Sequence, residues 1–157
     1  MAQPQTHPSS PRCPEGVTPA ERLMFWSLRA WASARHAGEP PQAPLGELLA
    51  AKTSARVAAL FMAWVQAVEA ASLRPIRGEC PHCGGASGDL QRLVVACGIA
   101  PVAFELGERL LEPLVSDTRT VMVLARSLNA ALAAAGWPLP ARVGVLAALP
   151  AASETVH

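Results

Sequence analysis

Hydrophobic residues recur at helical spacing through most of the chain. The clearest pattern covers residues 54–72, where apolar side chains follow i, i+3, i+4 and i+7 spacing and therefore share one face of a helix. No segment keeps the strict alternation of a half-buried strand, and no repeat of fixed period or long heptad is present. The pattern predicts an all-α fold. The apolar residues of this face are Val57, Leu60, Phe61, Trp64, Val68 and Ala71.

Residues typical of helix starts and helix ends predict the remaining helices. Thr18-Pro19-Ala20-Glu21 combines a capping residue, a proline at the first helical position and a glutamate three residues after the cap. Gly38 and Gly136 are predicted to end two of the helices. The predicted helices are 18–37, 44–51, 54–72, 87–98, 101–113 and 117–135, with a weaker one at 141–149.

These segments predict a compact bundle of about five to six helices in a single domain, residues 18–149. Connections are short, and a cysteine-containing turn separates two helical halves. Residues 1–17 are rich in proline and lack any apolar period, so we expect a disordered tail. Residues 150–157 are predicted to form a loose C-terminal tail.

The amino-acid composition limits the classes of molecule that we expect the protein to bind. Of the 157 residues, 51% are hydrophobic and only 16% are charged, against roughly 25% in an average domain. Such a chain needs large buried faces or a face that meets a protein partner. The net charge of +1 supplies no basic field for nucleic acid, so we expect none to bind. We attribute the abundance of Ala and Arg to a GC-rich, bacterial genome.

Location follows from apolar runs and cysteine use. The longest uncharged apolar helical run, Val57–Val68, falls short of the roughly 18 residues of a membrane span. Residues 1–16 hold no apolar core of the kind a secretory signal needs. We therefore predict a cytoplasmic protein without a membrane span. In that compartment its four cysteines are expected to be free thiols, metal ligands or catalytic groups.

Cys80-Pro81-His82-Cys83-Gly84 is the segment with the clearest capacity for chemistry. It resembles the Cys-Pro-x-Cys-Gly knuckle of zinc ribbons, in which proline sets the turn and glycine lets backbone N–H groups face the sulfurs. A structural zinc takes four ligands, and Cys80 and Cys83 supply two. Candidates for the others are Cys97, Cys13 and His82, although Cys97 lies on an apolar helical face where cysteine behaves as a small hydrophobe.

Other interpretations of this turn stay open. Two chains could share one metal, which would make a homodimer, and an iron–sulfur cluster would use the same thiolates. Cys-Pro-His-Cys is also identical to the active-site tetrapeptide of the thioredoxin-fold disulfide oxidases, a resemblance that implies a redox dithiol at Cys80 and Cys83. Residues 74–79 do not resemble the buried strand that precedes that motif in a thioredoxin fold. The turn could also be incidental, with no chemical role.

Trp26 marks a second candidate site. In the predicted helix 18–37 it falls on the polar side, close to Arg22 and Arg29. Tryptophan and arginine are enriched at the energetic centres of protein interfaces, so the three residues form a candidate partner-binding patch. The competing interpretation is that a second layer of the fold covers Trp26.

No catalytic constellation emerges from the sequence. It contains no phosphate-binding loop with its lysine and no Gly-x-Ser-x-Gly elbow. We therefore expect a non-enzymatic helical accessory or adaptor protein that binds a protein partner, with a structural metal at the cysteine turn. The alternative is a thiol-based redox or metal-transfer protein that uses Cys80 and Cys83 directly.

Overall fold

The structure is a computed structural model that describes residues 16–79 and 86–144. Over these residues it contains six helices and no strand, with two isolated antiparallel β-bridges. The prediction of an all-α bundle of five to six helices is confirmed. The helices are α1 (Pro19–His36), α2 (Gln42–Lys52), α3 (Ala55–Ala71), α4 (Gly88–Ile99), α5 (Phe104–Leu111) and α6 (Thr118–Ala134).

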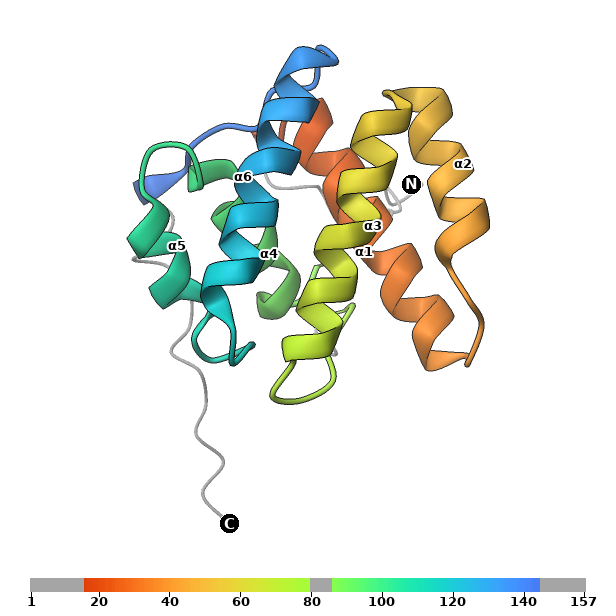
Figure 1. The fold of residues 1–157 in the computed structure, drawn as a ribbon, viewed down its shortest axis with the longest axis horizontal. Coiled ribbons are helices and arrows are strands. Elements are labelled where there is room, and N and C mark those ends of the chain that lie inside the picture. The colour runs from red at the N-terminus through yellow and green to blue at the C-terminus, as the bar shows by residue number, and fades with distance from the viewer. Residues whose placement is uncertain (1–15, 80–85, 145–157) are drawn as a thin grey trace, which may run out of the picture.

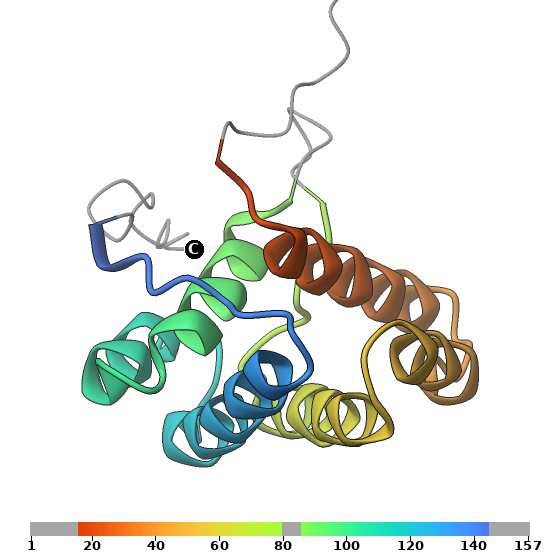
Figure 2. The ribbon, with the colours of Figure 1, turned by 90° about the horizontal axis from the view of Figure 1, so that it is seen from above.

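The helices pack in two layers. In Figure 1, α3 and α6 lie side by side at the front, with α5 outside α6 and α2 outside α3. Figure 2 shows that α4 and α1 form a second layer behind them. The outer side of α1 therefore faces away from α3 and α6. This arrangement leaves one face of α1 for solvent and turns the other toward the core.

Side-chain caps start four of the helices where the sequence predicts them. Thr18 and Glu21 form the reciprocal capping box of α1: the Glu21 amide donates to Thr18 Oγ1 at 3.2 Å, and the Thr18 amide donates to Glu21 Oε2 at 2.8 Å. Ser54, Ser87 and Asp117 each accept an amide N–H from the first turn of α3, α4 and α6. Capping satisfies backbone donors that the first turn of a helix leaves free.

One hydrophobic core joins residues from all six helices. Phe61 and Trp64 of α3 are fully buried and meet edge to face, with ring centroids 6.1 Å apart and planes at 64°. The apolar faces that the sequence pattern identifies are thus turned inward. None of the helices in the described ranges is long and apolar enough to cross a membrane.

A strap, defined as residues Trp137–Arg142, ties the end of α6 back to α1. Gly136 takes φ +82°, and Trp137 N–H donates to Leu132 O at 2.8 Å, which closes α6 with a Schellman motif. At the far end of the strap, Arg142 binds the buried carboxylate of Glu21 through Nε and through Nη2, the latter at 2.7 Å from Oε2. The last element described therefore holds the first turn of the first helix.

Two predicted boundaries beside the α4–α5 connection are wrong. Helix α4 does not end at Gly98 but continues through Ile99, with Gly98 buried. Helix α5 begins at Phe104 rather than Pro101, because Ile99 O accepts the amides of Val102 and Ala103 and turns the chain there. Val102 is consequently 70% exposed instead of lying on a buried face.

The predicted helix 141–149 differs from the structure at its start, whereas Val143 and Gly144 form a short 3₁₀ segment. Ala141 and Arg142 are not helical, since the strap leads Arg142 to Glu21. Residues 145–149 of that segment lie outside the described ranges, as do the predicted tails except for Gly16 and Val17.

Close packing between the strap and α4 depends on Gly98. A Cβ atom at this position would lie 2.4 Å from the backbone oxygen of Pro140, nearer than two atoms can approach without movement of the chain. By contrast, a Cβ at Gly107 would meet the flexible end of Met122, and one at Gly46 of α2 would meet nothing within 4 Å. Gly98 therefore lets the strap cross α4 at short range.

We predict that Gly98→Ala lowers the free energy of unfolding by about 1–3 kcal/mol, because either α4 or the strap must shift. Gly46→Ala is the matched control. It should raise the free energy of unfolding by about 0.5–1 kcal/mol, since alanine favours a helix interior. Urea midpoints of the two variants against the parent measure both effects. Equal midpoints for Gly98→Ala and the parent would contradict the proposed packing.

Candidate functional site

The residues directly before and after the cysteine segment, residues 80–85, are paired with each other. Cys80, His82 and Cys83 lie in residues 80–85, outside the described residues, as does Cys13. The chain on both sides of this segment is described, and Glu79 and Ala86 form an antiparallel β-bridge. The residues that flank this segment therefore lie next to each other, and we call this pair the base of the cysteine segment.

A buried carboxylate holds that base to the bundle. Asp89, in the first turn of α4, accepts hydrogen bonds from Arg74 Nη1 at 2.7 Å and Arg74 Nη2 at 2.8 Å, and from the Arg77 amide at 3.0 Å. Ser87 Oγ donates to Arg77 O while it caps α4. We call these four residues the Asp89 clamp. It joins the residues before the cysteine segment to the residues after it.

The charge of Asp89 is stabilised by its partners. Burial alone raises the pKa of this carboxyl, but the hydrogen bonds from Arg74 and Arg77 and the charge of Arg74 outweigh burial, so that the pKa lies below its ordinary value. The Arg74 side chain is 43% exposed and that of Asp89 is 10% exposed. Water therefore partly screens the charge of Arg74, whereas the carboxylate of Asp89 is largely removed from water.

Further contacts fix the connection between α3 and α4 on both sides. Leu73 N–H donates to Leu114 O, and Ser116 N–H donates to Ala71 O, both at 2.9 Å, so the end of α3 is tied to the α5–α6 connection. On the other side, a Cβ at Gly78 would lie 3.2 Å from the Cβ of Ala32 in α1. The chain therefore passes against α1 two residues before Cys80.

Cys97 occupies a different environment from the cysteine segment. It is fully buried in α4, and its Sγ donates to Ala125 O of α6 at 3.5 Å. Burial raises the pKa of the thiol to about 12, which favours the neutral form over the thiolate that metals bind. Neighbouring Asn129 donates to the backbone oxygens of Cys97 and Gly98 at 2.9 and 3.4 Å, so this part of α4 is bonded tightly to α6.

Within residues 16–79 and 86–144, no three His, Cys, Asp or Glu side chains are grouped in a way that could hold a metal ion. A site with three such ligands therefore needs at least one residue from outside these ranges or from a second chain. The described residues contribute the base of the cysteine segment.

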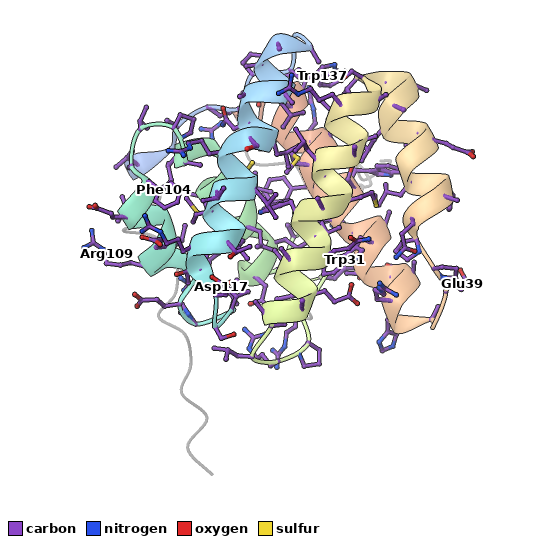
Figure 3. All side chains as sticks on the ribbon, viewed as in Figure 1. Trp31, Glu39, Phe104, Arg109, Asp117 and Trp137 are labelled. Atoms are coloured by element: carbon purple, nitrogen blue, oxygen red, sulfur yellow. The ribbon has the colours of Figure 1, made fainter. Side chains whose placement is uncertain are left out.

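The outer face of α1 carries the second candidate site. Trp26 is 48% exposed, so no second layer built from residues 16–79 and 86–144 covers it. Arg22, one turn earlier, is exposed, and Arg29 is half-buried. Trp31 on the same helix is only 4% exposed and belongs to the hydrophobic core (Figure 3). The structure thus brings Arg22, Trp26 and Arg29 together on one surface, as the sequence analysis expects.

Other exposed features differ from this patch. Large apolar side chains are also exposed at Leu73, Val102, Val123 and Val143, each on a different element of the described chain. Two shallow hollows, of about 240 and 350 Å³, lie at opposite ends of the seam between α3 and α6. Both are lined mainly by alanines and neither brings together two groups suited to acid–base catalysis.

Sequence reasoning missed the Asp89 clamp. Asp89 lies two residues after the cap of α4, where an acidic residue is ordinary because it favours a helix N-terminus. Arg74 lies 15 residues earlier and follows no recognisable motif. The sequence does place charged residues on both sides of the cysteine segment. It does not specify which of Arg74, Arg77 and Arg92 contacts the carboxylate of Asp89.

Comparison with protein-family models, with curated proteins and with solved structures finds no match to this chain.

We predict that Asp89→Asn lowers the free energy of unfolding by about 1–3 kcal/mol at neutral pH, because charge-assisted hydrogen bonds are replaced by weaker ones. Since the folded pKa of Asp89 lies below its value in the unfolded chain, the stabilisation is complete above about pH 4. It is lost as the pH falls through the lower folded pKa. Urea denaturation between pH 2 and 7 measures this dependence, which should flatten in the variant.

Asp117→Asn is the matched control for this experiment. Asp117 is exposed and caps α6, and asparagine caps a helix about as well as aspartate. This variant should retain the acid dependence that Asp89 contributes. An unchanged acid profile in Asp89→Asn would show that the clamp does not stabilise the fold.

Proposed function

We propose that this chain is a helical accessory protein that binds a protein partner through Arg22, Trp26 and Arg29 on the outer face of α1. The observation that carries the proposal is the position of Trp26. Leu23, Met24, Leu28 and Trp31 of α1 are buried and Phe25 is half-buried, whereas the Trp26 side chain is 48% exposed beside two arginines. Exposing about half of an indole forgoes burial that would otherwise stabilise the monomer.

We propose further that Cys80 and Cys83 bind a zinc ion, with an iron–sulfur cluster as the less favoured occupant. Support comes from the base of the segment, which the Glu79–Ala86 bridge and the Asp89 clamp hold closed. Two thiolates separated by two residues in a closed loop fit adjacent positions of a tetrahedral metal. Cys13, His82 and a second chain are the candidate sources of further ligands. Cys97 is a poorer candidate because its thiol is buried and bonded to α6.

The alternative function is thiol chemistry at Cys80 and Cys83. The same closed base would suit a dithiol that forms a reversible disulfide, since it holds the two ends of the loop together in both redox states. The six helices in the described chain offer no βαβ unit, so any such activity would act on a fold unlike thioredoxin. Zinc binding and redox chemistry make different demands on the protein and can be separated.

For the partner-binding surface, we predict that a photo-crosslinking residue at position 26 of the full-length protein links to a specific protein in cells of the source organism. A crosslinker at position 123, which is 44% exposed on α6, is the control and should not link to it. With the linked protein purified, Trp26→Ala should weaken the complex at least tenfold by calorimetry, as expected for a central tryptophan. Val123→Ala should leave the affinity unchanged. Equal effects of the two substitutions would contradict the proposal.

For the metal, we predict about one zinc per site in protein purified anaerobically, lost in the double variant Cys80→Ser/Cys83→Ser. Removal of zinc with a chelator should also lower the melting temperature, because bound metal stabilises the folded state. Cys97→Ala is the matched control and should retain zinc. Loss of zinc in that control would make Cys97 a ligand. A metal-free protein in which Cys80 or Cys83 has a low pKa would favour the redox alternative.

A further inference from the structure

We propose that the partner of α1 presents an acidic segment with an apolar side chain, so that carboxylates pair with Arg22 and Arg29 on either side of Trp26. This inference rests on the proposed function and adds the chemistry of the partner. Its occupant is a carboxylate-rich protein segment rather than a nucleic acid or a second copy of the chain. Charge, exposure and spacing on α1 support this choice.

The outer stripe of α1 is cationic. Arg22, Trp26, Arg29, Ser33 and His36 follow one another at spacings of four, three, four and three residues, and therefore lie along one face of the helix. This stripe contains no carboxylate. It spans roughly 21 Å from its first residue to its last, which suits a short peptide segment.

Two carboxylates close to α1 are already engaged. Glu21, the one acidic residue within α1, is buried and bound by Arg142 and by the Thr18 amide. Glu69 of α3 pairs with Arg35 at 2.8 Å, on another side of α1. Arg22 and Arg29 form no ion pair with the residues that the structure describes. Their charges are thus available to a partner.

Part of the Arg29 side chain is packed against the protein. Its Nε is buried and lacks a hydrogen-bond partner among the described residues, while the residue as a whole remains partly exposed. A side chain fixed by packing loses less conformational freedom when its terminal nitrogens meet a carboxylate. The flat guanidinium then offers two parallel N–H donors to both oxygens of that group.

Trp26 lies between the two arginines and supplies the apolar centre. Interface hot spots are commonly central tryptophan or arginine side chains surrounded by contacts that exclude water. A nucleic acid is disfavoured, because its binding depends mainly on cationic contacts to phosphates and the stripe provides two arginines and one histidine. A second copy of α1 is disfavoured as well, since it would oppose like charges.

Three fluorescein-labelled peptides of equal length test the proposal with the full-length protein. One alternates Glu and Leu, and the others replace every Glu by Gln or by Lys. The Glu peptide should bind at least tenfold more tightly than the other two, and its binding should weaken as salt screens the charges. It should also change the fluorescence of the parent protein by an amount that Trp26→Phe removes.

Charge variants complete the test. Arg22→Gln should weaken binding of the Glu peptide roughly threefold and Arg22→Gln/Arg29→Gln about tenfold, the sizes expected for one and two exposed charge pairs. Arg109→Gln removes an exposed arginine from α5 and should have no effect. Because Arg29 is half-buried, melting curves accompany its variant, while the exposed Arg22 provides a test that folding cannot confound.

The outcomes separate the two proposals. Equal binding of the Glu and Gln peptides, both lost in Trp26→Ala, would overturn the acidic partner and leave the Trp26 contact of the proposed function intact. Failure of all three peptides to bind would overturn the acidic partner, and the crosslinking experiment would judge the proposed function independently. Single-stranded DNA that competes equally with the Glu peptide would overturn the choice of a protein segment.

Discussion

The Asp89 carboxylate connects the two halves of the bundle. A buried carboxylate is stable only when its lone pairs are satisfied, and Arg74 and the Arg77 amide satisfy three of them. That requirement fixes where the long connection from α3 meets α4. The Glu79–Ala86 bridge lies in the same connection, directly before and after the cysteine segment. Any chemistry of Cys80 and Cys83 would therefore take place between two described residues that are paired with each other.

A second ion pair, between Glu21 and Arg142, joins the first turn of α1 to the strap. Glu21 begins α1 through its capping box and also accepts hydrogen bonds from Arg142 in the strap. Gly98 lets that strap cross α4 at close range. Helix α1 is therefore held at its first turn by the strap and along its side by the connection before Cys80. Its outer face, with Trp26, is left exposed as part of a well-anchored helix.

The two candidate sites both involve α1 or residues that contact it. The residues that precede Cys80 pass against Ala32 of α1, and the stripe that contains Trp26 runs along the same helix. A metal bound at the cysteine segment would stabilise a connection that already contacts α1. The Trp26 stripe and the residues that lead to the cysteine segment thus both involve α1.

The sequence determined the local elements. The capping box at Thr18, the serine caps at Ser54 and Ser87 and the glycine at 136 each act on backbone groups within a few residues, so short-range patterns suffice to place them. Errors arose where a glycine predicts a helix end: Gly98 instead lies inside α4, where the strap packs against it. Tertiary structure alone paired Arg74 with Asp89 and Arg142 with Glu21, and left Trp26 uncovered. Such pairings join residues 15 and 121 positions apart, and no periodicity in the sequence carries that information because it depends on how whole helices pack.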